Sequence, residues 1–221
     1  EAAPTVDAGP ATASICAGDS YTLGLASVSN AISPVWTTTG SGSFSPSEND
    51  LNPVYTPSAT DIALGTVTLQ LDASNSSCPS ESDEIILTIQ PLPQISILDS
   101  SAIFCDDVTT LNIINVSGSD YEPASLKWTT SGEGNFIDDT ALNPEYVPQG
   151  TDFINGVTLY VQVSGENNTS CSAAIATDEI EVNFSPAPEV YAGAAAEICV
   201  TDISYTISDA TKGAGTSTVW S

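Results

Sequence analysis

Carboxylates, cysteines and closely spaced glycines are the groups in this sequence whose types and spacing could do chemistry. The 221 residues include 28 acidic side chains, five cysteines, two lysines and no histidine or arginine. A pair of carboxylates is sufficient for glycoside hydrolysis, but no particular pair stands out here. Without histidine there is no ordinary base to activate a serine or cysteine nucleophile, and without arginine no guanidinium to clamp a phosphate. The composition therefore predicts that the protein is not an enzyme.

A glycine-rich segment, WTTTGSGSF from Trp36 to Phe44, is the most suggestive local motif. Phosphate-binding loops lie between a strand and the start of a helix, and they usually bring a basic residue. This segment lies between two strand-like stretches and has no basic residue near it. We therefore expect Gly40 and Gly42 to provide the positive φ angles of a hairpin turn, and Trp36 to be buried in a core.

The charge balance restricts the partners of the chain. Its only bases are Lys127 and Lys212, and the formal net charge is -26 at pH 7. Such a charge repels nucleic acids and anionic lipids, so we expect binding to neither. No apolar run approaches the roughly 20 residues that span a bilayer, so no direct membrane insertion is expected. The first residues, EAAPTVDAG, lack the regions of a signal peptide, which indicates a mature or excised piece of a longer protein.

Internal repeats organise the chain. WTTTGSGSF returns as WTTSGEGNF at 128–136, and LNPVYTPSATDIALGTVTL at 51–69 returns as LNPEYVPQGTDFINGVTL at 142–159. The three tryptophans, Trp36, Trp128 and Trp220, are spaced by 92 residues. Self-similarity at a fixed period indicates a tandem array. We predict one repeat at 1–91, a second at 92–185, and the incomplete N-terminal part of a third at 186–221.

Each repeat has the pattern of an all-β fold. Apolar residues alternate with polar ones at 66–72 and 84–90, and turn residues separate such stretches at short intervals. About seven short strands per repeat, with a tryptophan on the third, indicate an immunoglobulin-like β-sandwich, and such repeats would stack head to tail. A phase slip between Ile113 and Ile114 predicts a β-bulge, and TDIALG predicts a single helical turn. The expected core residues are Trp36, Trp128, Tyr55 and Tyr146.

The cysteines lie at matching places in the repeats and form no CxxC motif, so they predict disulfides in an oxidising compartment. One pairing stays within repeats and joins Cys16 to Cys78 and Cys105 to Cys171. Cys16 precedes the expected second strand, and Cys78 follows the sixth, at 66–73. About ten strand residues, at about 3.3 Å each, would separate the two cysteines. A disulfide allows at most about 7 Å between their Cα atoms. Head-to-tail stacking would instead bring Cys16 to Cys171. We favour this inter-repeat bridge, which reserves Cys78, Cys105 and Cys199 for neighbours outside the chain.

Two explanations remain open for the many acids. Calcium at the repeat junctions would stiffen the array, but Asp7 aligns with Ser96 and Tyr191, so the junction acids do not recur. Asp61 and Asp152 do recur, each four residues before a glycine, and a side chain that caps a tight turn explains them more simply. We therefore expect no cofactor and favour a solvated acidic surface that keeps the protein soluble, with calcium as the alternative.

The succession of CAGD before a strand, WTTTGSGSF, NPVYTPSATDIALG and a late cysteine resembles the PKD-like repeats of giant secreted surface proteins of Bacteroidota. Many of those are adhesins linked to gliding motility and exported by the type 9 secretion system. The second repeat departs from the pattern, since CDD stands in place of CAGD. The resemblance implies an extracellular, cell-surface location and neighbouring repeats of one long chain as partners. DTA at 139–141 resembles the O-glycosylation signal of the same group, which would place a sugar on Thr140.

Three functions follow from these observations. The favoured one is a structural stalk that holds an adhesive region away from the cell, because near-identical motifs recur in every repeat. The alternative is an adhesion module that binds surface glycans or other cell-surface proteins, for which Tyr121 and Phe153 are the candidate aromatic residues. The third, part of a secreted glycoside hydrolase, is least favoured.

Overall fold

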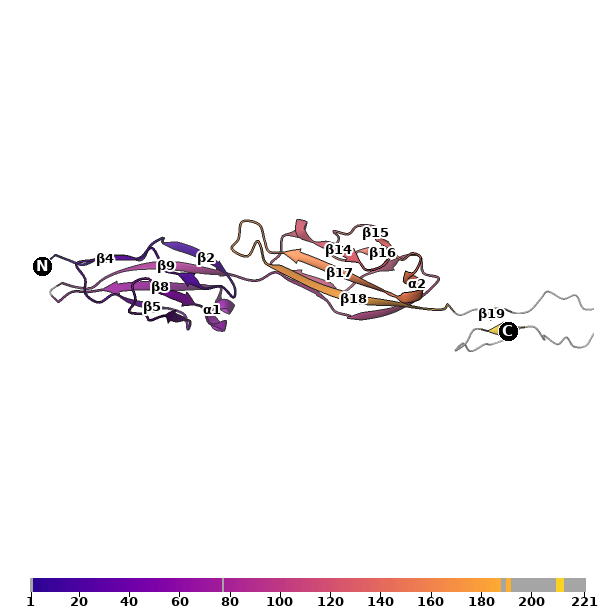
Figure 1. The fold of residues 1–221 in the computed structure, drawn as a ribbon, viewed down its shortest axis with the longest axis horizontal. Helices are drawn as coiled ribbons and strands as arrows, with labels where there is room; N and C mark the ends of the chain where they lie inside the picture. The colour runs from indigo at the N-terminus through magenta and orange to yellow at the C-terminus, as the bar shows by residue number, and fades with distance from the viewer. Residues whose placement is uncertain (1, 77, 188–189, 192–209, 213–221) are drawn as a thin grey trace, which may run out of the picture.

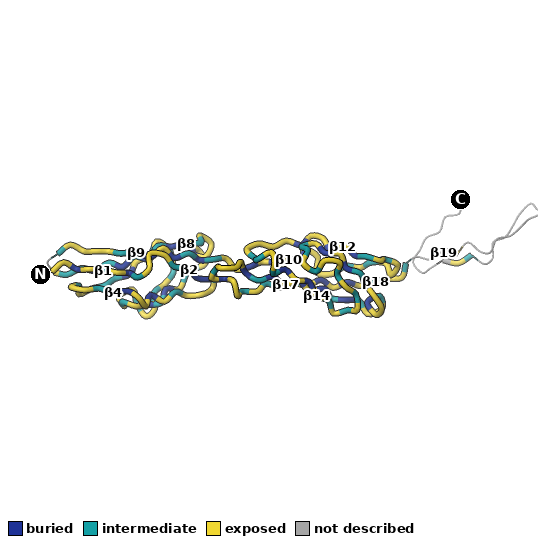
Figure 2. The backbone as a smooth tube through the Cα atoms, turned by 90° about the horizontal axis from the view of Figure 1, so that it is seen from above, coloured by how far each residue is buried: buried dark blue, intermediate teal, exposed yellow. Residues whose placement is uncertain are grey.

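The computed structural model of the chain describes residues 2–76, 78–187, 190–191 and 210–212. The chain is all-β, with two β-sandwiches that lie end to end (Figure 1). Figure 2 shows the same arrangement from above, with the buried stretches inside each sandwich. Strands β1 to β9 fall within 1–91 and β10 to β18 within 92–185. Most of the third predicted repeat, including Trp220 and Cys199, lies outside the described residues.

The elements of the first sandwich are β1 (Thr5–Asp7), β2 (Thr12–Cys16), β3 (Tyr21–Thr22), β4 (Ser27–Ser29), β5 (Val35–Thr38), β6 (Ser43–Ser45), β7 (Val54–Thr56), α1 (Ala59–Leu64), β8 (Thr66–Ala73) and β9 (Glu81–Gln90). Those of the second are β10 (Gln94–Ile97), β11 (Ser101–Cys105), β12 (Leu111–Asn112), β13 (Val116–Ser119), the 3-10 turn η1 (Pro123–Ser125), β14 (Lys127–Thr130), β15 (Asn135–Phe136), β16 (Glu145–Val147), α2 (Asp152–Asn155), β17 (Val157–Ser164) and β18 (Ile175–Ser185). Beyond them, β19 (Val190–Tyr191) pairs with β20 (Thr211–Lys212).

Both sandwiches have the same strand order. A four-stranded sheet, β2-β9-β8-β5 or β11-β18-β17-β14, faces a three-stranded sheet, β3-β7-β6 or β12-β16-β15, and a two-stranded ladder, β1-β4 or β10-β13, completes each. This is the immunoglobulin-like sandwich that the strand pattern predicted. In each four-stranded sheet the first strand runs parallel to the last strand of the sandwich.

The parallel edge strand is an addition to the seven strands that the sequence pattern predicted. Cys16 precedes β3, which is the second strand of the sequence pattern, as expected, but it is also the last residue of an additional strand, β2, with Gln90 as its Cα partner. Only Ile15 and Cys16 of β2 are buried, so the alternation is too short to be recognised from the sequence. β8, by contrast, begins and ends at the residues expected for the sixth strand.

Each sandwich encloses its own apolar cluster. The exposed fraction of the side chain is 1% for Trp36 and Trp128 and 0% for Tyr55 and Tyr146. Each tryptophan also donates its indole N–H to a backbone carbonyl, that of Leu51 at 3.1 Å in the first sandwich and that of Ala141 at 3.0 Å in the second. Burying a polar indole without such a partner would cost free energy.

The expected β-bulge near Ile113 is wrong. The chain there leaves one sheet for another, because β12 pairs with β16 whereas β13 pairs with β10. Ile113 is buried and Ile114 is 61% exposed, and Asn115 has a φ of 63° between the two strands. A change of sheet, made possible by a left-handed asparagine, therefore accounts for the phase slip.

The expected role of Gly40 and Gly42 is also wrong. Segment 36–44 is not a hairpin, since β5 pairs with β8 and β6 with β7, so it crosses between sheets. Neither glycine is among the residues with positive φ. A Cβ on Gly42 would lie 2.5 Å from the Tyr55 hydroxyl, and one on Gly40 would lie 2.8 Å from Val67 Cγ1. The glycines are needed because the loop packs directly on buried side chains.

Candidate functional site: the covalent joint between the sandwiches

The joint between the two sandwiches begins with a very short connection. β9 ends at Gln90 and β10 begins at Gln94, which leaves 91–93, with the sequence Pro-Leu-Pro. Two prolines in three residues fix their φ angles, and a segment of this length spans at most about 10 Å. The connection alone therefore keeps the sandwiches close, but it would let them swing about one point.

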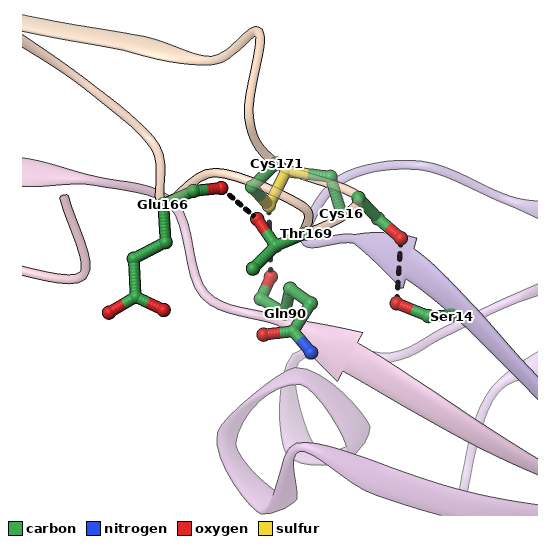
Figure 3. The surroundings of a disulfide bond; sticks show 7 residues. Ser14, Cys16, Gln90, Glu166, Thr169 and Cys171 are labelled. Atoms are coloured by element: carbon green, nitrogen blue, oxygen red, sulfur yellow. Dashed lines mark hydrogen bonds between the residues drawn. A yellow bond between two sulfur atoms is a disulfide. The ribbon is translucent and has the colours of Figure 1, made fainter. Parts of the chain in front are cut away.

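A disulfide makes a second connection across the joint. Cys16, at the end of β2, is bonded to Cys171, in the loop between β17 and β18, and their Cα atoms are 4.8 Å apart (Figure 3). The separation fits ordinary disulfide geometry. Both cysteines are buried, and the bond closes a sequence separation of 155 residues.

The loop that carries Cys171, at 165–174, is held in shape by its own backbone. Gly165 N donates to the Ala174 carbonyl at 2.9 Å, and Ala174 N donates to the Cys171 carbonyl at 2.8 Å. The Thr169 hydroxyl donates to the Glu166 carbonyl at 2.7 Å (Figure 3). A Cβ on Gly165 would lie 2.8 Å from the carbonyl carbon of Cys171, so the loop closes tightly only with glycine there.

Polar contacts accompany the disulfide. The hydroxyls of Ser14 and Ser170 are 2.6 Å apart and form a hydrogen bond between the sandwiches. The sulfur of Cys171 lies 3.4 Å from the carbonyl oxygen of Gln90 (Figure 3). The Cys171 loop thus lies against both edges of the joint, β2 and the end of β9.

The two connections leave the first sandwich from neighbouring strands. Cys16 and Gln90 are Cα partners in the parallel ladder, so the bond and the linker start about one strand spacing, ~4.8 Å, apart. Two attachment points suppress rotation about either one alone. The softest remaining motion is a hinge about the line that joins them.

The other two cysteines of the described residues lie far from this bond. Cys105 ends β11 beside Ser185, at the opposite end of β18 from Cys171, and its thiol is exposed. Cys78 lies in the loop between β8 and β9, where its N–H donates to Asn75 Oδ1 at 2.8 Å. Cys105 occupies in the second sandwich the position that Cys16 occupies in the first.

The other candidate residues do not gather into one site. Thr140 is exposed, and its N–H and hydroxyl both donate to Asp138 Oδ1, at 2.9 and 2.7 Å. Tyr121 is half-buried against the second core, and the Phe153 ring packs on Phe184 with 5.0 Å between centroids. Both aromatic side chains are thus engaged in local packing.

The recurring acid of the first repeat has a structural role. Asp61 is 0% exposed and accepts hydrogen bonds from Ser41 N at 2.8 Å, Ser58 N at 3.0 Å and the Tyr55 hydroxyl at 2.8 Å. Burial opposes ionisation, but these hydrogen bonds outweigh it and lower the pKa of the carboxyl. Asp61 also completes a capping box with Ser58 at the start of α1. This agrees with the turn-capping role expected from its spacing.

Asp152 repeats the arrangement in the second sandwich. Its carboxylate accepts from the backbone N–H groups of Glu133, Gly134 and Gln149 at 2.8, 3.0 and 3.0 Å, and from the Tyr146 hydroxyl at 2.8 Å. Burial again opposes ionisation, and the hydrogen bonds again lower the pKa. These buried carboxylates tie the glycine-rich loop to the rest of the sandwich, which is why the motifs recur together.

No group of three or more His, Cys, Asp or Glu side chains within the described ranges is arranged to hold a metal ion. In the same part of the chain, no helix has the length and apolarity needed to cross a bilayer.

Comparison with known proteins gives structural neighbours only. No protein-family profile matches the sequence, and no curated protein matches it. Among solved structures, human protocadherin-24 EC1-2 is 10% identical, with 84% of this chain and 100% of that one covered and a TM-score of 0.47. Insect hemolin is 11% identical (82% and 47% covered, TM-score 0.47), and a titin A168169 structure is 14% identical (83% and 100% covered, TM-score 0.39).

Proposed function

We propose that the chain is a spacer segment of a large extracellular adhesin, a stalk that holds an adhesive region away from the cell surface. The observation that carries the proposal is the disulfide between consecutive sandwiches. A joint with two covalent connections resists twisting and bending in every direction except about the line that joins them, and stiffness is the property that a spacer needs. Neighbouring repeats of the same long chain are its immediate partners.

The disulfide also determines how the segment responds to tension. A force applied at the two ends passes from residue 16 directly to residue 171 through the sulfur–sulfur bond. Both apolar clusters lie almost entirely inside the 155-residue loop that the bond closes. While the bond is intact, tension therefore cannot extend residues 16–171, and it acts only on the sandwich strands outside the loop, β1, β2 and β18.

The same inter-repeat disulfide would recur along an array. Cys105 ends β11 as Cys16 ends β2, so it is placed to bond a loop cysteine of a following repeat. Each joint would then carry one bridge, and consecutive bridges would enclose overlapping stretches of chain. Such an array would behave as a rod.

The biological setting is proposed from the resemblance to PKD-like repeats. It comprises a secreted cell-surface protein of Bacteroidota, export by the type 9 secretion system and a role in gliding motility. We propose that the joint is stiffened by the disulfide and needs no calcium, because the acids near the repeat boundaries do not recur.

Small-angle X-ray scattering tests the proposal. The oxidised chain should give one narrow distribution of extended shapes, unchanged by EDTA, whereas a Cys171→Ser variant should give a broader one that includes bent shapes. Cys105→Ser is the matched control and should scatter as the wild type does. Identical distributions for the oxidised chain and Cys171→Ser would contradict a stiffening role for the bond.

A further inference from the structure

The outer face of the four-stranded sheet in the second sandwich carries a hollow whose lining combines polar side chains with an aromatic residue at its centre. Because side chains alternate along a strand, β14, β17 and β18 direct one set inward and another outward. The outward set encloses a hollow of about 600 Å³. Its main members are Lys127, Thr129, Tyr160, Gln162, Thr177 and Glu179.

The strand register places these side chains in two rows. Tyr160 has Thr129 as its Cα partner on one side and Glu179 on the other, and Gln162 lies between Lys127 and Thr177. Cross-strand partners on one face lie within about 5.5 Å at Cβ. Hydroxyl, carboxylate, amide and ammonium groups thus surround the tyrosine within the reach of one small ligand.

Packing in the core does not explain why a tyrosine stands at position 160. Its side chain is 40% exposed, whereas its strand neighbours Leu159 and Val161 are buried in the core. Lys127 forms an ion pair with Asp139 and stays 55% exposed at the rim. Core residues recur between the repeats, so the exposed aromatic residue at this position distinguishes the second repeat from the first.

The first sandwich keeps a threonine and a glutamate, Thr37 and Glu84, where the second has Thr129 and Glu179, but it lacks the tyrosine and the lysine. Val35 stands where the second has Lys127, and Gln70 stands where it has Tyr160. Gln70 donates to Asp72 Oδ1 at 3.0 Å, so those two polar groups satisfy each other. The two repeats therefore share a core and differ on this face, which is the pattern expected if one of them binds something.

We propose that this face of the second sandwich binds an uncharged carbohydrate chain. An aromatic ring flanked by hydroxyl, amide and carboxylate groups matches a sugar ring, which has C–H faces and a rim of hydroxyls that both donate and accept. The net charge of -26 disfavours anionic polymers. A single aromatic residue among polar ones does not provide the apolar core of a protein interface. This binding function is separate from the spacer role.

Titration of the isotopically labelled 221-residue chain tests the proposal by residue-resolved NMR. The probes are uncharged hexasaccharides of glucose, xylose, mannose and N-acetylglucosamine, at up to about 10 mM, which detects a Kd of about 1 mM. At least one should shift resonances at 127–129, 158–162 and 177–179. Tyr160→Gln, which installs the residue of the first repeat, should weaken that binding about tenfold or more without shifting core resonances.

Gln70→Ala, at the matching position of the first sandwich, is the control and should leave the affinity unchanged. An oligomer of galacturonic acid, which is anionic, should not bind. No shift with any neutral probe would overturn the proposal. Shifts confined to other faces, or equal affinity for Tyr160→Gln and the wild type, would also overturn it.

Discussion

Breaking the Cys16–Cys171 bond should lengthen the part of the chain that a pulling force can extend. In the oxidised protein, tension between the ends can draw out only residues 1–16 and 171–221. Loss of the bond adds the enclosed 155 residues. Since each extended residue spans at most about 3.3 to 3.6 Å, the added contour length is roughly 510 to 560 Å.

Optical tweezers with handles fixed at the two ends measure this length directly. Cys171→Ser should unfold with the full added extension, and so should the wild type under a reducing agent. Neither apolar cluster includes Cys16 or Cys171. Both sandwiches should therefore still fold without the bond. Cys105→Ser, the matched control, should behave as the oxidised wild type. If oxidised wild type releases the same length as Cys171→Ser, tension does not pass through this bond and the reasoning fails.

Three further predictions concern the glycine-rich loops of the two sandwiches and the groups that hold them. Gly42→Ala should lower the free energy of unfolding by about 1–3 kcal/mol in denaturant melts, because its Cβ would collide with the Tyr55 hydroxyl, whereas Gly24→Ala, with its nearest contact at 3.8 Å, should be nearly neutral. Asp152→Asn should cost about 1–3 kcal/mol at pH 7. Because the folded pKa of Asp152 is below its ordinary 3.8, the wild type should lose this stabilisation as the pH falls below 3.8, and the variant should show a smaller loss in acid melts. Burial raises the pKa of Tyr146 to about 12, so an absorbance titration of Tyr146→Phe should lack a phenol that ionises near pH 12. The stabilisation that the neutral phenol contributes is complete below pH 10. It should be lost as the pH rises from 10 through about 12.

The repeats, the all-β class and the buried aromatic residues followed from the sequence because they depend on local alternation and on self-similarity. Trp36 and Tyr55 are surrounded by motifs that return in the second repeat with few changes, so a shared core was the simplest explanation. The position of β8 could be predicted since eight residues alternate without interruption.

Features that depend on contacts between distant segments were missed. In the sequence, Gly40 and Gly42 look like turn-forming residues. Glycine is needed at these positions because a Cβ would collide with Asp61 or Tyr55, about 20 and 13 residues away, and only the fold brings these residues together. β2 escaped notice because its hydrogen bonds go to β9, the last strand of the sandwich. The face around Tyr160 is assembled from three strands, and an aromatic residue at an outward position has no local signature.

A disulfide map of the native, unreduced chain tests the central claim most directly. Cleavage after glutamate separates the four cysteines of the described residues into fragments 2–48, 49–81, 85–133 and 167–179, since the Glu122–Pro123 bond is not cut, and acidic conditions prevent exchange. If a disulfide joins the two sandwiches of a spacer, mass spectrometry should find fragment 2–48 linked to fragment 167–179. Linkage of 2–48 to 49–81, with 85–133 linked to 167–179, would contradict it and leave the two sandwiches joined by a single covalent connection.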